Sequence, residues 1–343
     1  MSVPQARVET EPPRVSDGAA GIAASALPQA TVNRRELSLH GAALALLAAA
    51  PFMLGPGYLS TLGRILFFAL LAASLALLVG FVGLPSLGHA AYFGIGAYAA
   101  GLIGIHVTAS APVQLAVAVL VAAAVAVPTG WLAIRSHGIY FLMLTLAIGE
   151  IVFLFAERSE NVTGGSNGLF GIPASEVLPG APVTDPAPLY WYVLAVFAVG
   201  YAVLWAATRS PFGLALRGIR DNEDRMRALG YATRRYKLAA FCLAGAVAGL
   251  AGALLAAHSR FVTPTDASFG TSVVALVAVI IGGAGSLWGA CLGAAIVIIV
   301  RDEIGSSLGG HGPLVLGAVF ILAVYLLPGG IAGLLGRLGR RRS

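Results

Sequence analysis

The charged side chains of this chain are concentrated in one segment, Arg209–Leu238, where they could form ionic contacts or bind a partner protein. The segment holds eight basic and three acidic residues, although the whole chain of 343 residues has only 21 lysines and arginines. Apolar residues recur between the charges, and residues that start and stop helices accompany them. This pattern fits a structured docking element and, equally, a solvated hairpin with interfacial arginines.

Residues typical of helix termini divide the charged segment into two short helices. Ser210 can cap free N–H groups and Pro211 fits the first turn, so a first helix should run from here to about Arg220. Asp221 offers a second N-cap, with Asp224 three residues later in a variant of the capping box. The second helix should therefore be short and begin at Asp221.

The second short helix carries an apolar face that could enter a groove on a partner. Met226 and Leu229 lie three residues apart, so they should share one side of the helix between charged flanks. Gly230 follows, and glycine accepts the left-handed conformation that ends many helices. We therefore expect the helix to end at Leu229 and to present both apolar side chains to a partner.

Ionisable side chains inside apolar stretches are the other candidates for chemistry. Glu150 lies within LMLTLAIGEIVFLF, and a carboxylate in such a run must face protein or water or be neutral. Pairing with another span, with Arg64 as a candidate partner, is favoured over a proton relay. His89, close to Ser86 and Tyr92, could contact a substrate, although its position favours a hydrogen bond at a helix start.

The composition places these residues in an integral membrane protein. Apolar residues make up 58% of the chain and charged residues 10%, against about 25% charged in soluble proteins. The apolar residues form blocks near the 20 residues that an α-helix needs to cross about 30 Å of hydrocarbon. We therefore expect an all-α polytopic bundle of about ten spans, with about eight to ten as the range. The blocks cover residues 39–56, 62–83, 87–106, 113–134, 138–156, 189–208, 238–258, 270–283, 287–300 and 314–335.

The eighth and ninth blocks are short and differ from the others. Only GGAGS, Gly282–Ser286, separates them. They could form two tight spans or one broken, partly re-entrant unit, which a membrane tolerates where protein surrounds it.

Basic residues predict the orientation, because Lys and Arg that flank spans are retained in the cytoplasm. Arg34 and Arg35 precede the first block, Arg135 follows the fourth, the charged segment follows the sixth, and a basic cluster follows the last. Cytoplasmic termini place all of these inside and leave Arg64 as an interfacial or intramolecular residue. The net charge of +6 thus reflects topology and not nucleic-acid binding. The predicted parts are a disordered cytoplasmic tail at 1–35, a transmembrane domain at 36–336 with a cytoplasmic loop at 209–237, and a basic cytoplasmic tail at 337–343.

Five stretches, spread over almost the whole chain, share motifs with one transporter family. They are GLPSLGHAAYFGIGAYAAGLI at Gly83–Ile103, TGGSNGL at Thr163–Leu169, ALRGIRDNEDRMRALGYATRRYKLAAF at Ala215–Phe241, IIGGAGSLWGACLGA at Ile280–Ala294 and LLPGGIAGLL at Leu326–Leu335. Together they resemble permease subunits of branched-chain amino-acid ABC importers, over about residues 37–340. The likeness is greatest to the larger of the two permeases in such importers.

The resemblance implies a permease that forms the translocation path for branched-chain amino acids across a lipid membrane, the bacterial plasma membrane. Its implied partners are a second, homologous permease, two cytoplasmic ATP-binding subunits and an extracytoplasmic solute-binding protein. Residues 209–237 would be the coupling loop toward the ATPases, through Arg217, Arg220, Asp221, Asn222, Glu223, Met226, Ala228, Leu229 and Gly230. Candidates for the substrate path are Ser86, His89, Tyr92 and Glu150. Gly164, Gly165 and Asn167 would face the binding protein, although such glycines could instead only form turns.

Two departures from the family pattern bear on the transported molecule. Leu84 and Pro85 stand where the family often has Gly-Gln, and Asn167 stands where it often has Asp. Related permeases carry urea, short amides or aromatic acids, so these substrates remain alternatives to branched-chain amino acids.

The sequence contains no phosphate-binding motif for ATP. A phosphate-binding loop needs Gly-Lys followed by Ser or Thr, but Lys237 is the only lysine and Leu238 follows it. No His-Glu metal cluster or nucleophile-base pair stands out. We therefore predict a transport subunit that is not an enzyme, binds no cofactor or metal and depends on ATP used by partner subunits. The alternative is a secondary transporter or channel for a small polar solute, with Glu150 as an ion-coupling group.

Overall fold

The computed structural model describes residues 34–178 and 181–304, together with a few residues between 314 and 333. The chain divides into two units between residues 41 and 42, and the second contains nearly all of the described helices. Helices dominate the described part, accompanied by one short β-hairpin. In order they are α2 (Arg34–Met53), α3 (Pro56–Ala76), the π-helical turn η1 (Leu77–Val82), α4 (Ala90–His106), α5 (Ala111–Ala133), α6 (Ile139–Arg158), α7 (Glu160–Thr163), η2 (Gly165–Asn167), β1 (Glu176–Leu178), β2 (Ala181–Pro182), α8 (Pro186–Arg209), α9 (Pro211–Asp221), α10 (Glu223–Ala228), α11 (Thr233–Ser259), η3 (Pro264–Ala267), α12 (Phe269–Gly282), α13 (Leu287–Ile298) and η4 (Ile299–Ile304).

The helices are those of a polytopic membrane protein, as predicted. In the described residues, five are long and apolar enough to cross a membrane: α3 with η1, α5, α6, α8 and α11. α12 and α13 pass the same test together as a bent pair, which gives up to six. The apolar part of α2 and the whole of α4 are shorter, and the 17 residues of α4 cover about 25 Å. Residues 1–33, most of 314–335 and residues 337–343 lie outside the described residues, so the predicted tails and last span are untested there.

α3 and α11 form the centre of the second unit. In the most apolar window of α3 with η1, 94% of residues are buried, compared with 22% in α5 and 28% in α6. α11 packs against α4, α5 and α3. The outer faces of α5 and α6 are therefore left for lipid or for other subunits.

α4 approaches α11 closely because glycines occupy the contact. A Cβ on Gly96 would lie 2.2 Å from the Gly249 carbonyl oxygen, and a Cβ on Gly252 would lie 1.9 Å from that of Phe93. Small residues at helix contacts let backbones come together in lipid, where no hydrophobic effect drives association. The glycine-rich sequence of α4 thus serves packing.

α12 and α13 form the sharp break that GGAGS predicts. The two helices are bent by 120° across residues 283–286. They remain in contact, since a Cβ on Gly293 would lie 1.9 Å from the Ala278 carbonyl oxygen. With 14 and 12 residues, each is too short to cross the hydrocarbon alone.

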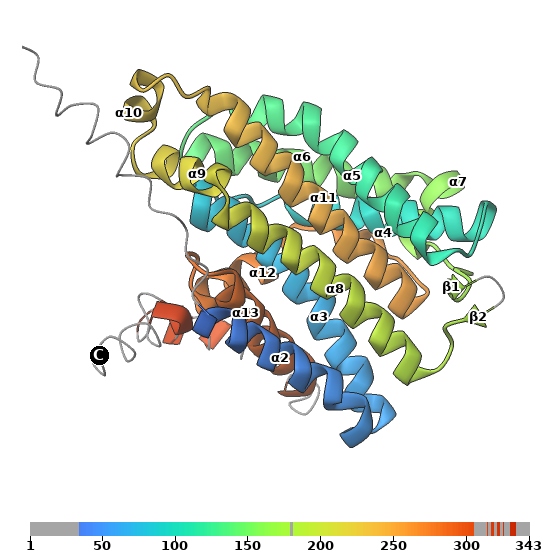
Figure 1. The fold of residues 1–343 in the computed structure, drawn as a ribbon. Helices are drawn as coiled ribbons and strands as arrows, with labels where there is room; N and C mark the ends of the chain where they lie inside the picture. The colour runs from blue at the N-terminus through green and yellow to red at the C-terminus, as the bar shows by residue number, and fades with distance from the viewer. Residues whose placement is uncertain are drawn as a thin grey trace, which may run out of the picture. The chain divides into compact units, whose positions relative to one another are not determined.

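The connection between α6 and α8 and the connection between α8 and α11 lie at opposite ends of the bundle. Figure 1 shows α9 and α10 at one end and α7 with the hairpin of β1 and β2 at the other. In the hairpin, which is antiparallel, Glu176 pairs with Pro182 and Leu178 with Ala181. α3 and α11 run between the two ends (Figure 1).

Candidate functional site

The predicted coupling loop, residues 209–237 and called the coupling loop below, folds into two short helices that connect α8 to α11 (Figure 1). α9 begins at Pro211, as predicted, and buries Leu216 and Ile219 against the bundle. The Ser210 side chain does not cap this helix, because its hydroxyl turns back and donates to the Ala207 carbonyl at 2.7 Å. The start of α9 therefore depends on Pro211 and on burial of the apolar face.

Asn222, and not Asp221, caps the second helix. Asn222 is extended, with φ of −160°, and its Oδ1 accepts a hydrogen bond from Arg225 N at 2.9 Å. Asp221 is the last residue of α9, and its Oδ1 lies 2.9 Å from Arg220 Nη2. The predicted cap at Asp221 is wrong because α9 takes that residue into its last turn.

Gly230 follows the end of α10 and reverses the chain, as predicted. Its φ of +86° lies in the left-handed region that favours glycine. Gly230 N donates to the Arg227 carbonyl at 2.9 Å, and Tyr231 N donates to that of Met226 at 3.1 Å. These bonds satisfy carbonyls at the helix terminus and direct the chain into α11.

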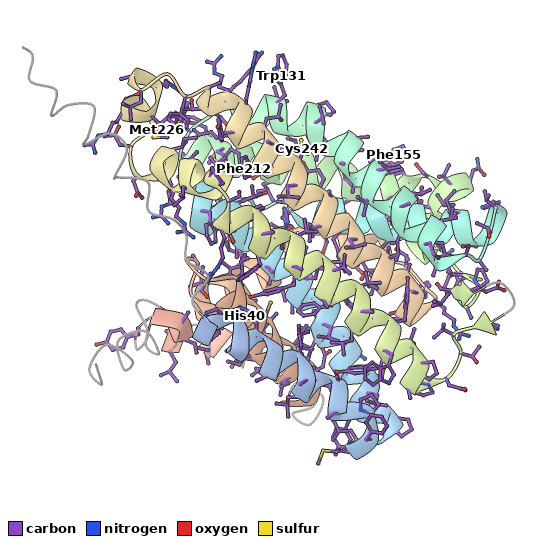
Figure 2. All side chains as sticks on the ribbon, in the orientation of Figure 1. His40, Trp131, Phe155, Phe212, Met226 and Cys242 are labelled. Carbon is purple, nitrogen blue, oxygen red and sulfur yellow. The ribbon has the colours of Figure 1, made fainter. Side chains whose placement is uncertain are left out.

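The two apolar side chains of α10 have different surroundings. Met226 is half-buried and packs on Gly218 of α9, where an added Cβ would lie 2.8 Å from Met226 Sδ (Figure 2). Leu229 is 67% exposed, and the nearby Tyr231 is 42% exposed. This corrects the expected shared face: Met226 holds α10 to α9, and Leu229 faces outward. Ala228 is also exposed.

Glu223 is the centre of an ionic network inside the coupling loop. Its Oε2 lies 2.5 Å from Lys237 Nζ, and its Oε1 lies 2.7 Å from Arg227 Nη2 and accepts a hydrogen bond from Thr233 Oγ1 at 3.1 Å. Burial raises the pKa of Glu223, but the hydrogen bonds and charges of Lys237 and Arg227 outweigh it and leave the pKa below its usual value. Much of the charge gathered in this loop therefore holds α10 on the start of α11.

Two arginines of α9 connect the coupling loop to α3. Arg220 Nη1 donates to the Gly80 carbonyl, and the Arg217 guanidinium carbon lies 4.9 Å from the centroid of the Phe81 ring. Gly80 and Phe81 belong to η1, and π-helical turns often occur at functional sites. Gly80 also touches the break between α12 and α13, since a Cβ there would lie 1.5 Å from the Ala284 carbonyl oxygen. η1 is thus a junction between the coupling loop, α3 and the broken helix pair.

Ser86, His89 and Tyr92 lie inside the bundle. All three are buried, with His89 Nε2 2.8 Å from Ser74 Oγ and Tyr92 OH 2.8 Å from Thr129 Oγ1. The His89 ring therefore bonds across to α3 and does not cap α4. Among the described residues, Ser86 Oγ and His89 Nδ1 have no hydrogen-bond partner. In this conformation the three side chains contact protein, and a place on the substrate path stays a prediction.

Glu150 is exposed on α6 and does not pair with Arg64. Arg64 Nη1 lies 2.7 Å from Asp302 Oδ2, near the start of α3. The suggested pair is therefore wrong, whereas the interpretation of Arg64 as an intramolecular residue is confirmed. Glu150 lies near the middle of α6, so in a membrane it needs water or another protein group beside it.

The segment predicted to face a binding protein contains a tight turn. Gly164 and Gly165 have φ of +77° and +62°, which glycine adopts without strain. Leu169 N donates to the Val262 carbonyl at 2.8 Å and ties this turn to the chain that follows α11. The two glycines thus form a turn, and Asn167 is exposed beside it. Contact with a binding protein stays a prediction.

A cavity of about 630 Å³ lies at the end of α3 opposite to the coupling loop. Arg64, His258, Asp266 and Arg301 are among the residues that line it. The sequence points only to Arg64, because that arginine does not fit the topology. Asp266 and Arg301 could have been noticed as charges placed directly beside apolar blocks, but their meeting depends on the fold.

The chain is similar in sequence to known permeases and to one protein family. Residues 57–328 match a family model described as branched-chain amino acid transport system / permease component. The chain is 32% identical over 312 residues to the high-affinity branched-chain amino acid transport system permease protein LivM of Escherichia coli strain K12, covering 84% of this chain and 73% of that protein. It is 27% identical over 247 residues to the ribose import permease protein RbsC of the same strain, covering 68% of this chain and 73% of that protein. No solved structure matches.

Proposed function

The chain belongs to the branched-chain amino acid permease family, and on this premise we propose that it is the translocation subunit of an ATP-driven importer of branched-chain amino acids. The observation that carries the proposal is the coupling loop, whose arginines contact the core span through η1. A loop that only joined two spans would not need such contacts. The substrate class rests on the family and on the similarity to LivM. The similar permease RbsC is named for ribose import, so a permease of this kind can also serve another substrate.

ATP hydrolysis is assigned to separate subunits. Lys237 is the only lysine of the chain, and it is buried against Glu223 instead of standing in a phosphate-binding loop. We place two ATP-binding subunits below the coupling loop, where Leu229 and Tyr231 are exposed. An apolar anchor of this kind fits a groove on a partner.

Two contacts tie the coupling loop to the long helices of the bundle. The rings of Phe212 and Tyr236 stack with centroids 5.7 Å apart, which ties the start of α9 to the start of α11. Arg220 adds the contact with η1. Closure of the ATPase pair on ATP would therefore move α9 together with α3 and α11.

A second, homologous permease is proposed to complete the pore along α6. Met143, Ile151 and Phe155 are 61%, 66% and 64% exposed on this helix, with Glu150 exposed among them. Lipid would solvate the apolar side chains but not the carboxylate. A partner subunit or a water-filled path beside α6 resolves this conflict.

We infer a topology of about ten spans in the bacterial plasma membrane, with both termini and the coupling loop in the cytoplasm. The segment with Asn167 then lies outside, where a solute-binding protein would dock. Support comes from the placement of these two segments at opposite ends of the bundle (Figure 1).

Single cysteines should show the two segments on opposite sides of the membrane. In a variant with Cys242 and Cys291 replaced, Phe170→Cys should react with an impermeant maleimide from outside, and Arg225→Cys only after the cytoplasmic face is opened. Both positions are exposed, so access is limited by the membrane. Labelling of both cysteines from one side would contradict the topology and the role of the coupling loop together.

Reconstituted vesicles test the proposed function. The chain with its second permease, two ATPases and binding protein should import labelled leucine, isoleucine or valine only when ATP is on the coupling-loop side. Vesicles with this chain alone should import none. Robust uptake by the chain alone, driven by a proton gradient, would instead indicate a secondary transporter in which Glu150 couples the ion.

A further inference from the structure

The cavity of about 630 Å³ has the position and size of a small-molecule site. It lies between the start of α3, the end of α11, η3 and the first turn of α12. Its volume falls within the roughly 300–1,000 Å³ of ligand pockets. The proposed topology places it on the extracytoplasmic side, where substrate arrives.

One side of the cavity carries excess positive charge. Arg64 and Arg301 converge on Asp302, with Arg64 Nη1 2.7 Å from Asp302 Oδ2 and Arg301 Nε 3.0 Å from Asp302 Oδ1. One carboxylate thus serves two guanidinium groups. Among the hydrogen bonds of the described residues, each guanidinium donates only to Asp302, so both keep N–H groups for another acceptor.

The first turn of α12 adds to the positive side. Gly270 and Thr271 line the cavity, and the N-terminus of a helix favours a negative group. Broken helices present such ends to anionic groups in other transporters. A carboxylate is therefore the group that this side of the cavity suits best.

The cavity lining also contains a carboxyl group, that of Asp266. Asp266 uses Oδ2 to accept hydrogen bonds from Thr263 N and Thr263 Oγ1, each at 2.8 Å. In the described residues no bond occupies its Oδ1. Burial raises the pKa of Asp266, and an ammonium beside Oδ1 would oppose that shift. Asp266 thus complements a cation.

The rest of the lining is mixed. It includes polar residues, among them Ser60 and His258, and four apolar side chains, Phe67, Phe68, Leu255 and Val274. The apolar side chains offer contact area for a hydrocarbon group but no hydrogen bonds.

We propose that this cavity binds a single α-amino acid as a zwitterion, with its carboxylate at Arg64 and Arg301, its ammonium at Asp266 and its apolar side chain on Phe67 and Phe68. The inference rests on the proposed function, and it identifies the cavity as the first place where the substrate contacts the permease. Substrate released by a binding protein would be held here before it moves along α3. The cavity therefore selects for both charges of an amino acid as well as for its side chain.

Equilibrium binding of labelled leucine to the full chain in lipid nanodiscs tests the site. Asp266→Asn and Arg301→Gln should each weaken leucine binding by tenfold or more. The asparagine can still accept from Thr263 N, and Asp302 keeps Arg64, so both variants should fold, as their melting temperatures would show. Arg158→Gln is the matched control, since Arg158 is exposed at the end of α6 and does not line the cavity.

Competition by leucine analogues that lack one of the two charged groups distinguishes a zwitterion site from a general apolar pocket. Isocaproate and isopentylamine should compete with leucine at least tenfold more weakly than isoleucine does. Equal competition by either analogue, or unchanged leucine binding in both cavity variants, would overturn the site. Import of leucine by the complete complex with no binding to the nanodisc chain would also overturn it while leaving the proposed function intact. Failure of the wild-type complex to import leucine would count against the proposed function instead.

Discussion

Leu229→Asp should abolish association with the ATPases and ATP-driven uptake while the permease remains inserted and folded. Leu229 is 67% exposed, so the substitution costs the free permease little. In the complex, a few anchors carry most of the binding energy, on the order of 1–3 kcal/mol each, and a buried aspartate would add an unpaired charge. A loss of about 3 kcal/mol weakens binding by more than about 100-fold. Co-purification of the ATPases with tagged permease measures the effect.

Val177→Asp is the matched control for this substitution. Val177 is 47% exposed in β1, at the opposite end of the bundle, so the control tests the same chemical change away from the ATPases. It should leave both association and coupling intact. Normal ATP-dependent uptake by a complete complex carrying Leu229→Asp would show that the coupling loop is a solvated connector.

The helices could be predicted from the sequence because burial in lipid requires long apolar runs. The blocks at 113–134 and 189–208 correspond to α5 and α8 within a few residues. The length of an apolar block also indicates which helices do not cross the membrane alone. The short block at 287–300, for example, forms part of the bent pair of α12 and α13. What length does not reveal is whether a helix of 17 residues crosses the membrane, because tilt and neighbours decide that.

Cap residues were harder to predict because adjacent residues can compete for one role. Asp221 and Asn222 both have side chains that can cap α10. The choice depends on where α9 ends, and α9 ends at Asp221, one residue later than expected. Gly230 had no such competitor, and its left-handed conformation followed from its residue type.

Long-range polar contacts could not be predicted because the sequence does not say which segments meet. Glu223 with Lys237, Arg220 with Gly80, and Arg64 with Asp302 are 14, 140 and 238 residues apart. Arg64 and Glu150 had complementary charges and were reasonable partners, but they lie on different parts of the bundle. The cavity and the η1 junction both consist of such contacts, so they emerge only from the fold.

Arg220→Ala should uncouple transport from ATP hydrolysis while the ATPases stay bound. Arg220 reaches from α9 to the Gly80 carbonyl, and a Cβ on Gly83 would lie 2.9 Å from Arg220 Cγ, so its stem also packs on η1. Hydrogen bonds from charged groups contribute about 1.5–3 kcal/mol, and loss of about 1.4 kcal/mol corresponds to a factor of about ten. We expect uptake to fall by roughly tenfold with ATPase activity retained. Uptake per ATP hydrolysed in proteoliposomes measures the coupling.

Arg225→Ala and Arg217→Ala are the control substitutions with which the effect of Arg220→Ala on uptake per ATP is compared. Arg225 supplies its backbone N–H, and not its side chain, to the cap of α10, so its truncation should leave coupling unchanged. Arg217 packs over Phe81 and makes one hydrogen bond of 3.4 Å to the Thr208 carbonyl, so its loss should have a mild effect. Wild-type uptake per ATP in Arg220→Ala would show that η1 is a packing contact without a part in coupling. Motion would then pass through the stacked pair Phe212 and Tyr236 into α8 and α11.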